Sequence, residues 1–322
     1  MNIRAVAVAA MLFAVGGAFA QTATPSSAPS AASTWTSIGP GVEYRRFQGN
    51  NIDVHVTRID LTNDQIRVVA TRESERGLRV SDFARKTKAI AAINADYFDA
   101  QMNPIGLTIG PCGRWEGTKD TTREGVIAVG EGRARIDQQR DVMETPEKWI
   151  DTAVSGWPLL VRDCTALKAE ELPGSKAFTH SPHPRTAIGS SRDGKTLYFV
   201  VADGRRENAP GMTLGQLAEF MDTELDVCSA MNFDGGGSSA MWAGDKLVSR
   251  PSDGSERRVA DHLAVVRRSD VAACDTVVET KAAERRLAIK AEATAEAATP
   301  KSTATSAVTP ATPKANTSNA PQ

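Results

Sequence analysis

The sequence predicts an α+β fold, in which a single domain of mixed, largely antiparallel β-sheet carries a few packed helices. Two pairs of strand-like runs enclose short glycine turns and have the pattern of β-hairpins. One pair spans residues 126–136 around a Gly-Glu-Gly turn, and the other spans 186–202 around an Asp-Gly turn, a dipeptide favoured in tight hairpins. Helical patterns are few and do not alternate regularly with the strands. Hairpins mixed with occasional helices are typical of α+β domains and argue against repeated βαβ units.

Hydrophobic periodicity places the other strands of the domain. Residues 52–59 alternate apolar and polar side chains as a half-buried strand does, and residues 65–71 continue in a similar way. Apolar runs predict three later strands, at 89–93, 246–248 and 263–266.

Two helices have recognisable starts. Ser81 is the expected N-cap of a short helix that ends near Lys88. Thr213 and Gln216 have the spacing of a capping box, which predicts a helix over 214–225. The apolar side chains of that helix fall on one face, so we expect them to pack in the core rather than to contact a ligand.

The two ends of the chain differ in composition from its middle. Residues 1–20 have the pattern of a secretory signal, with a basic residue, an apolar run and a small-x-small cleavage site. Residues 21–40 predict a flexible linker, and 276–322 predict a short helix followed by a disordered Ala/Thr/Pro-rich tail. After the signal, no stretch approaches the roughly 20 apolar residues that a membrane span needs. The folded domain is therefore expected over 41–275, in an exported protein that is periplasmic or secreted.

Charge and cysteine spacing narrow the class of protein. The formal net charge is −1, which leaves no basic footprint for nucleic acid. The four cysteines contain no CxxC pair, so a zinc site or a thioredoxin-type motif has little support. In an oxidising compartment we expect two disulfides, Cys112 with Cys164 and Cys228 with Cys274, although three pairings are open and some cysteines could be small buried hydrophobes. The oligomeric state is left open.

The segment 229–242, SAMNFDGGGSSAMW, is the most informative motif of the chain. Three adjacent glycines follow an apolar strand and Asp234. Because glycine gives up much chain entropy on folding, a bend through positive φ or a close approach is expected here. Consecutive N–H groups in such a bend form an anion-binding concavity, to which Ser238 and Ser239 add hydroxyl donors. The motif predicts a site for a phosphate-bearing or polyhydroxylated ligand; a tight turn between two strands is the alternative.

Four polar clusters are each expected to follow an apolar strand. They lie at 94–99, 183–186, 203–205 and 234–239. Loops at the ends of buried strands are where binding sites are usually assembled, so we expect a shared pocket lined by carboxylates and guanidinium groups. For any single residue, the alternative is that the Asp caps a turn or that the Arg pairs with it.

Several common chemistries lack their motifs in this chain. There is no GxxxxGK[ST] loop, no GxSxG elbow and no HExxH pair, which argues against a nucleotide triphosphate site, an α/β-type serine hydrolase and a zinc protease. No cofactor is therefore expected to be required and no metal ligands are assigned, while calcium held by aspartates is left open.

The order and spacing of four segments resemble one family. They are NADYFD at 94–99, HPRTAIG at 183–189, VADGR followed by GMTLGQLAEFM from 201 onward, and MNFDGGGSSAMW at 231–242. Together they resemble the phosphodiester glycosidase family over about 94–266. The chain departs from the common N-G-G-F-F at 94–98, and from the common V-A-N-A-L at 259–263, where it has V-A-D-H-L. Because both departures fall beside the expected pocket, the family's substrate is not carried over.

The resemblance implies hydrolysis of a sugar–phosphate diester at the bond between the anomeric carbon and a phosphate oxygen. The expected catalytic residues are Asp234, Asp96 and Arg185. Arg185 holds the phosphate together with N–H groups of the glycine turn, and one of the two aspartates stabilises or attacks the oxocarbenium-like centre. Asp203 and Arg205 are expected to orient sugar hydroxyls. The full set of expected substrate-binding residues is Asn94, Tyr97, Asp203, Arg205, Gly235, Gly236, Gly237, Ser238 and Ser239.

The expected function is that of an exported hydrolase that cleaves a sugar-1-phosphodiester of cell-envelope or exopolysaccharide glycans. Its expected partner is the carbohydrate phosphodiester substrate, with no nucleic acid and no membrane span. One alternative is a non-catalytic phospho-glycan binding protein in envelope or exopolysaccharide assembly. Another is a phosphodiesterase that cuts the P–O bond on the far side of the phosphate.

Overall fold

The structure is a computed structural model that describes residues 34–115, 125–137 and 146–274, together with Lys281, Glu284 and Ala288. Contacts divide the chain into Met1–Ala32 and Ser33–Gln322, and every described residue belongs to the second unit. The predicted signal at 1–20 lies outside the described residues. Of the predicted tail helix, only the three single residues are described, and they are helical and exposed. Across these described ranges, no helix is long and apolar enough to cross a bilayer.

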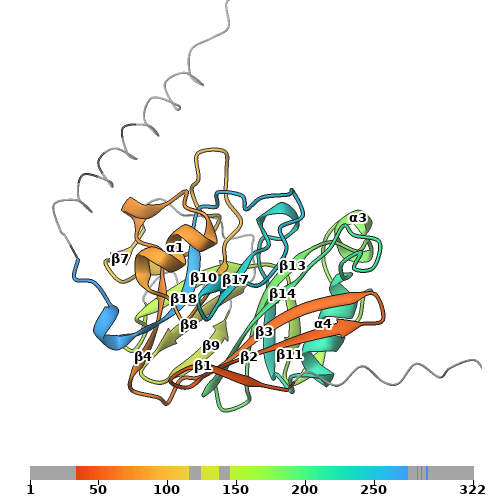
Figure 1. Cartoon of the computed structure of the whole chain (residues 1–322), viewed down its shortest axis with the longest axis horizontal. Helices are drawn as coiled ribbons and strands as arrows, with labels where there is room; N and C mark the ends of the chain where they lie inside the picture. The colour runs from red at the N-terminus through yellow and green to blue at the C-terminus, as the bar shows by residue number, and fades with distance from the viewer. Residues whose placement is uncertain are drawn as a thin grey trace, which may run out of the picture. The chain divides into compact units, whose positions relative to one another are not determined.

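The described unit contains three β-sheets in which all strand pairs are antiparallel, so the predicted α+β class is confirmed. The largest sheet has eight strands, several of which are labelled in Figure 1. In spatial order they are β1 (Thr36–Gly39), β2 (Val42–Gly49), β3 (Ile52–Asp60), β14 (Thr196–Ala202), β13 (Arg185–Ser190), β15 (Ser229–Asn232), β11 (Leu159–Arg162) and β12 (Thr165–Ala166).

The two smaller sheets have five strands each. One consists of β7 (Gly113–Arg114), β6 (Ile109–Gly110), β10 (Thr152–Gly156), β8 (Gly125–Gly130) and β9 (Arg133–Asp137). The other consists of β17 (Lys246–Leu247), β16 (Met241–Ala243), β5 (Ala91–Asn94), β18 (His262–Arg267) and β4 (Ile66–Ala70). The two predicted hairpins are confirmed as β8–β9 and β13–β14.

Three α-helices accompany the sheets in the described part of the chain: α1 (Val80–Thr87), α3 (Lys176–His180) and α4 (Leu214–Thr223). Helix α4 begins at the predicted capping box, in which Gln216 N donates to Thr213 Oγ1 and Thr213 N donates to Gln216 Oε1. Its apolar face packs on the eight-stranded sheet, where Leu217 and Met221 join Val200 in one buried cluster. The prediction that this face belongs to the core is therefore confirmed.

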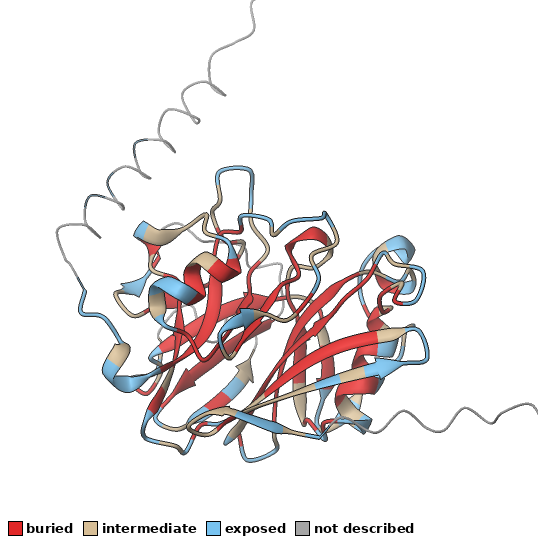
Figure 2. Cartoon of the chain, viewed as in Figure 1, coloured by how far each residue is buried: buried red, intermediate tan, exposed pale blue. Residues whose placement is uncertain are grey.

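The central hydrophobic core lies between the sheets, because each of them contributes side chains to one buried cluster. Ile188 and Met231 come from the eight-stranded sheet, Ile127 from the sheet of β8, and Ile93 and Leu263 from the sheet of β5. Figure 2 shows the inner strands of all three sheets as buried. This shared core holds the ends of strands from different sheets at fixed positions, which is what a site built from strand ends requires.

Two local expectations were wrong because contacts outside the local segment decided the structure there. Ser81 lies in the first turn of α1, whose N-cap is Arg79. Its N and Oγ donate to the two carboxylate oxygens of Glu256, at 2.8 and 2.5 Å, so a distant residue uses the groups that capping would have used. Strand β1 falls inside the expected linker 21–40. It pairs with β2, and Ile38 packs on the central core, so the folded part begins earlier than the composition suggested.

The expected disulfide pairing was also wrong. The bonds join Cys112 to Cys274 and Cys164 to Cys228. Cys164 lies two residues after the end of β11, and β11 pairs with β15, which begins just after Cys228. Cys164 N donates to Cys228 O at 2.8 Å, so strand pairing sets this bond. Strand neighbours decide which cysteines pair, and cysteine spacing alone does not show which strands are neighbours.

Candidate active site

Backbone hydrogen bonds join three of the four predicted polar clusters where the sheet of β5 adjoins the eight-stranded sheet. The fourth cluster, 203–205, reaches the same place, because a β-carbon on Gly204 would lie 2.6 Å from Pro184 N and one on Gly236 would lie 3.1 Å from Arg205 Nη2. Phe233 N donates to Thr186 O at 2.8 Å, Gly236 N donates to Pro184 O at 2.8 Å, and Asp234 N donates to Ala95 O at 3.1 Å. The segments that follow β5 and β15 therefore lie against the segment that leads into β13, which was expected to follow a strand.

Asn94 is the residue that joins these segments. It ends β5 and is buried. Its Nδ2 donates to Asp234 O at 2.7 Å, and its Oδ1 accepts from Thr186 Oγ1 at 2.8 Å and from Ala240 N at 3.3 Å. Because both Nδ2 and Oδ1 already make hydrogen bonds within the protein, Asn94 positions the site rather than presenting a free group to a ligand.

The glycines of the DGGGSS segment are explained by close approach and by backbone conformation. A β-carbon on Gly235 would lie 2.9 Å from Pro184 O, and Gly236 has a φ of +62°. The turn continues as a short 3-10 helix over Gly236–Ser238. The N–H groups of Gly236 and Ser238 donate to Pro184 O and Gly235 O, so these two of the expected anion-binding donors are already used within the protein.

Asp234 is partly buried at the start of this turn. Burial raises the pKa of its carboxyl group, while hydrogen bonds from Ser238 and Gly235 and the positive charge of Arg257 oppose the rise. The carboxyl group thus lies among hydroxyl, amide and guanidinium donors, in a place that is not closed to solvent. This environment suits a carboxylate that acts on a bound ligand.

Asp96 and Asp261 form a fully buried carboxyl pair beside Asp234. Thr108 Oγ1 donates to Asp96 Oδ2 at 2.7 Å, and Asp96 N donates to Asp261 Oδ1 at 2.9 Å. The remaining oxygens, Asp96 Oδ1 and Asp261 Oδ2, accept no hydrogen bond from the described residues. Burial and the neighbouring carboxyl raise the pKa of Asp96 well above its usual value, and burial raises the pKa of Asp261 to about 7. The pair therefore shares a proton at neutral pH.

The sequence interpretation included Asp96 but missed Asp261 as a site residue. The signal was present, because Asp261 replaces the asparagine of the family pattern V-A-N-A-L, and Asp96 replaces a glycine of N-G-G-F-F. Asp96 is buried, and its carboxyl group already accepts from Thr108 and lies beside that of Asp261. The charge of Asp234 contributes to the raised pKa of Asp261, which places the pair within electrostatic reach of Asp234.

Arg185 is a buried guanidinium without an acidic partner. Its side chain is 2 % exposed, and its Nε and Nη2 donate to the carbonyl oxygens of Met212 at 3.0 Å and Phe178 at 2.6 Å. No carboxylate in the described part of the chain lies within ion-pair distance of it, and burial lowers its pKa to about 10. A buried cation is costly without a negative partner, so Arg185 is a candidate for binding an anionic ligand group.

Tyr97 and two further aromatic side chains lie near Arg185. Tyr97 OH accepts from Asn232 Nδ2 at 2.6 Å and donates to Trp157 O at 3.0 Å. The ring of Trp157 stacks on that of Phe178 with centroids 5.3 Å apart, and the guanidinium of Arg185 lies 5.2 Å from the Phe178 ring. Trp157 and Phe178 belong to no motif, and only the tertiary structure places them here.

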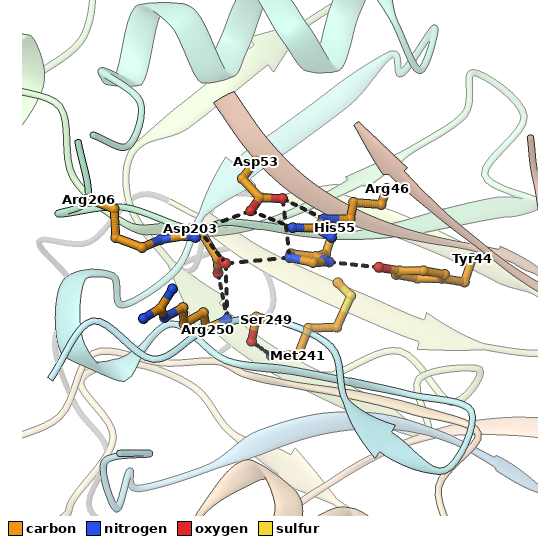
Figure 3. A network of polar contacts seen from close by, with 9 residues as sticks. All are labelled: Tyr44, Arg46, Asp53, His55, Asp203, Arg206, Met241, Ser249 and Arg250. Atoms are coloured by element: carbon orange, nitrogen blue, oxygen red, sulfur yellow. Dashed lines mark hydrogen bonds and ion pairs between the residues drawn. The ribbon is translucent and has the colours of Figure 1, made fainter. Parts of the chain in front are cut away.

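The structure places Asp203 elsewhere, in the polar network of Figure 3. Its Oδ2 accepts from Arg206 Nη2 at 2.9 Å, and both of its oxygens accept from Arg250 N, at 2.9 and 3.0 Å. Because the protein uses both oxygens, the expected role in orienting sugar hydroxyls has no support. Arg205, in contrast, lies at the glycine turn, where its Nη1 donates to Asp253 Oδ1 at 3.1 Å.

The same network groups three residues of the kinds that bind metal ions, Asp53, His55 and Asp203. His55 Nε2 lies 3.7 Å from Asp53 Oδ1 and 3.6 Å from Asp203 Oδ2. However, Arg46 donates to both oxygens of Asp53 at 2.7 Å, and Arg206 donates to both carboxylates. Two guanidinium groups already balance the two carboxylates and would repel a divalent cation. We interpret the network as structural.

The family model described as phosphodiester glycosidase matches residues 87–266, which is more than half of the chain. The chain therefore belongs to the phosphodiester glycosidase family, and the resemblance noted from the four segments is confirmed.

Individual relatives agree with this assignment. The chain is 38 % identical over 141 residues to the N-acetylglucosamine-1-phosphodiester alpha-N-acetylglucosaminidase of Homo sapiens, which covers 41 % of this chain and 26 % of that protein. It is 28 % identical over 193 residues to the SPbeta prophage-derived uncharacterized protein YomE of Bacillus subtilis, which covers 58 % of this chain and 29 % of that protein. The chain thus spans less than a third of the length of either relative.

Two solved structures share the fold. The catalytic domain of zebrafish N-acetylglucosamine-1-phosphodiester alpha-N-acetylglucosaminidase, auto-inhibited by its pro-peptide, has a TM-score of 0.56 at 20 % identity and covers 74 % of this chain and 87 % of that chain. A Burkholderia pseudomallei protein described as exported has a TM-score of 0.53 at 16 % identity, covering 67 % and 74 %. At these identities the likeness supports the fold alone.

Proposed function

We propose that this protein is an exported hydrolase that cleaves the glycosidic C–O bond of a sugar-1-phosphodiester in cell-envelope or exopolysaccharide glycans. The observation that carries the proposal is the placement of Asp234 and Arg185 at one strand edge, joined by the backbone bond from Gly236 N to Pro184 O. A partly buried carboxyl group and a buried guanidinium without an acidic partner match the two charges of such a reaction. Membership of the phosphodiester glycosidase family supports the same reaction class.

In the proposed mechanism, Asp234 faces the sugar and Arg185 faces the phosphate. When the bond between the anomeric carbon and the phosphate oxygen breaks, positive charge develops on the sugar ring and negative charge on the leaving phosphate. Asp234 stabilises or attacks the positively charged sugar centre, and Arg185 stabilises the negative charge of the leaving phosphate. Water supplies the hydroxyl that ends on the anomeric carbon, and the phosphomonoester leaves with the bond electrons. Phosphate is a good leaving group, so protonation by a strong general acid matters less than for an ordinary glycoside.

The buried pair of Asp96 and Asp261 is assigned a positioning role in this mechanism. Asp96 was expected to be catalytic; we assign it a positioning role instead, because its carboxyl group is bound to Thr108 and coupled to Asp261 within the protein. The charge of Asp234 is one cause of the raised pKa of Asp261, so the pair and Asp234 are electrostatically linked. Neutralising Asp234 should therefore lower the pKa of Asp261.

Export is part of the proposal. The secretory pattern of residues 1–20 supports it, although that segment lies outside the described residues. Two disulfides also support it, since such bonds form and persist in oxidising compartments. The structural neighbour described as exported is consistent with this localisation.

Product analysis tests the proposal. The purified chain is incubated with a panel of sugar-1-phosphodiesters, with and without a chelator, and the products are identified by mass spectrometry in ¹⁸O-labelled water. We expect free sugar that carries the label, together with an unlabelled phosphomonoester. Release of sugar-1-phosphate would instead indicate P–O cleavage. Saturable binding without any turnover would favour a non-catalytic phospho-glycan binding protein and overturn the hydrolase proposal.

A further inference from the structure

The loop 250–258, which leads from β17 to β18, is attached to the rest of the fold near both of its ends. Arg250 N donates to both carboxylate oxygens of Asp203, as Figure 3 shows. Glu256 accepts from Ser81 N and Ser81 Oγ. Between these two attachments, residues 253–255 are exposed. The middle of the loop can therefore change conformation while its ends stay in place.

Asp253, in this middle section, is held by two arginines. Its Oδ1 accepts from Arg205 Nη1 at 3.1 Å, and its Oδ2 accepts from Arg257 Nη2 at 2.6 Å. Arg257 Nη1 also donates to Ser238 Oγ of the DGGGSS segment, at 3.5 Å. Two guanidinium groups around one anion are the groups that proteins use to bind phosphoryl oxygens, and Ser238 Oγ lies beside one of the two.

These side chains lie directly on the glycine turn. A β-carbon on Gly237 would overlap Asp253 Oδ2 and Arg257 Nη2, and one on Gly236 would lie 3.1 Å from Arg205 Nη2. The missing side chains of these two glycines make room for the carboxylate and the guanidinium groups. Arg257 is also near enough to Asp234 for its charge to act on that carboxyl group. The arginines therefore adjoin the proposed catalytic carboxylate.

Asp253 differs from the other carboxylates that bind arginine nearby. The side chains of Asp53 and Asp203, which bind Arg206, are only 2–3 % exposed. The side chain of Asp253 is 35 % exposed, and those of Arg205 and Arg257 are 47 % and 46 % exposed. Ion pairs as exposed as these are weak because water and salt compete with them. A ligand can displace Asp253 at little cost, whereas the buried pairs are permanent.

We propose that Arg205, Arg257 and Ser238 form a binding site for a phosphoryl group, that Asp253 occupies this site when no ligand is bound, and that the substrate's phosphate displaces it. We call these three residues the arginine site. The inference rests on the proposed function, because it assigns the phosphate of that substrate to particular side chains. Arg185 then supplies a further positive charge from the Pro184 side of the turn.

The charge of the arginine site favours one ligand over another. A phosphomonoester carries about −1.5 to −2 at neutral pH, whereas a phosphodiester carries a single negative charge. Two guanidinium groups attract the more highly charged ligand more strongly. The phosphomonoester product is therefore expected to bind at the arginine site more tightly than the substrate, and to act as a product inhibitor.

Binding of methyl phosphate and of inorganic phosphate to the full chain, measured by isothermal titration calorimetry, tests the proposal without any turnover. We expect Asp253→Asn and Asp253→Ser each to bind at least about tenfold more tightly than the wild type, which corresponds to Asp253 filling the site about nine-tenths of the time. Asp245→Asn is the matched control, because Asp245 is an exposed aspartate in the turn between β16 and β17. Its binding should equal that of the wild type.

Adding Arg205→Gln and Arg257→Gln to Asp253→Asn should cancel the gain. The proposal is overturned if neither Asp253 variant binds more tightly than the wild type, or if the gain survives the loss of both arginines. Loss of thermal stability with no gain in binding would identify Asp253 as a purely structural partner. If the Asp253 variants bind phosphate more tightly but the protein hydrolyses no diester, the arginine site is supported and the hydrolase proposal is overturned. If the protein hydrolyses a diester but the Asp253 variants bind phosphate no more tightly, the hydrolase proposal is supported and the arginine site is overturned.

Discussion

Asp96 and Asp261, which are 165 residues apart in the sequence, lie side by side with Asp96 N donating to Asp261 Oδ1 at 2.9 Å. Neither side chain is more than 1 % exposed. Two carboxyl groups this close and this buried cannot both ionise at low cost, so one proton between them is the stable arrangement. Each stands at a position where the sequence departs from the common family pattern noted above.

Replacement of Asp261 by asparagine should stabilise the protein at alkaline pH. An unfolded aspartate has a pKa near 3.9, and the folded values here are raised, to about 7 for Asp261. Between about pH 4 and pH 7 the folded chain therefore binds more protons than the unfolded chain, and the pair's contribution to the free energy of unfolding falls as the pH rises. The amide of Asp261→Asn can donate to Asp96 Oδ1 and carries no charge.

We expect the free energy of unfolding of Asp261→Asn at pH 8 to exceed that of the wild type by about 1 kcal/mol or more, which is roughly 2–4 °C in Tm. At pH 4 the two free energies should be nearly equal. Differential scanning fluorimetry from pH 4 to 8 measures this difference. His262, whose pKa burial lowers to about 3, is present in both chains, so its opposite titration cancels in the comparison. Lower stability of the variant at every pH would show that the two carboxyl groups do not share a proton.

Replacement of Asp234 by asparagine should abolish most turnover with little effect on stability. Its carboxylate is assigned to the charge that develops on the sugar, so kcat should fall by about 10²–10³-fold. Burial disfavours the charged form of Asp234, so a neutral amide of the same size should change the free energy of unfolding by no more than about 0.5 kcal/mol. Steady-state kinetics and thermal unfolding measure the two effects. Turnover equal to that of the wild type would remove Asp234 from the mechanism.

Replacement of Arg185 by lysine should weaken binding of the phosphodiester. Lysine keeps the positive charge but cannot reproduce the planar fork that reaches Met212 O and Phe178 O. We expect KM for the diester to rise by about 10-fold or more, since one lost charge-assisted hydrogen bond is worth about 1.5–3 kcal/mol. Kinetics over a range of substrate concentrations, with circular dichroism as a check on folding, measures the change. Unchanged kinetics would contradict a role for Arg185 in holding the phosphate.

The disulfides should prove to be Cys112–Cys274 and Cys164–Cys228. Peptide mapping under non-reducing conditions identifies the pairs directly, and a peptide that joins Cys112 to Cys164 would contradict the structure. Removal of either bond by paired Cys→Ser changes should cost about 2–5 kcal/mol. The Cys112–Cys274 bond closes the longer segment, 162 residues against 64, so its loss should cost more. Chemical denaturation of the two double variants measures this order.

The elements that were predicted well are those whose signals are local. The Asp-Gly turn of β13–β14 and the Thr213–Gln216 capping box depend on residues a few positions apart, and both are found. Ser81 shows where local reasoning ends, because Glu256 binds the group that was expected to cap α1. The strand β1 was taken for linker because its pairing with β2 and its contacts with the core are invisible in its composition.

Local signals in the sequence likewise predicted some residues of the candidate site and not others. Strand-end clusters and the glycine motif predicted that Asn94, Arg185 and Asp234 would share a site, and backbone bonds hold their segments next to one another. Asp253 and Arg257 carried no signal, since they lie in an irregular loop outside every motif. Their proposed part in the site rests on their close approach to Gly237 and on their contacts with Arg205 and Ser238.

By itself, the sequence determined the α+β class, both hairpins, the family and most of the strand ends that build the site, because periodicity, turn chemistry and motif order are written in neighbouring residues. Only the tertiary structure decided which carboxylates share a proton, which guanidinium lacks an acidic partner and which cysteines pair. Those outcomes depend on burial and on distances between residues far apart in the chain. Charge interactions change steeply with both, and neither can be read from spacing.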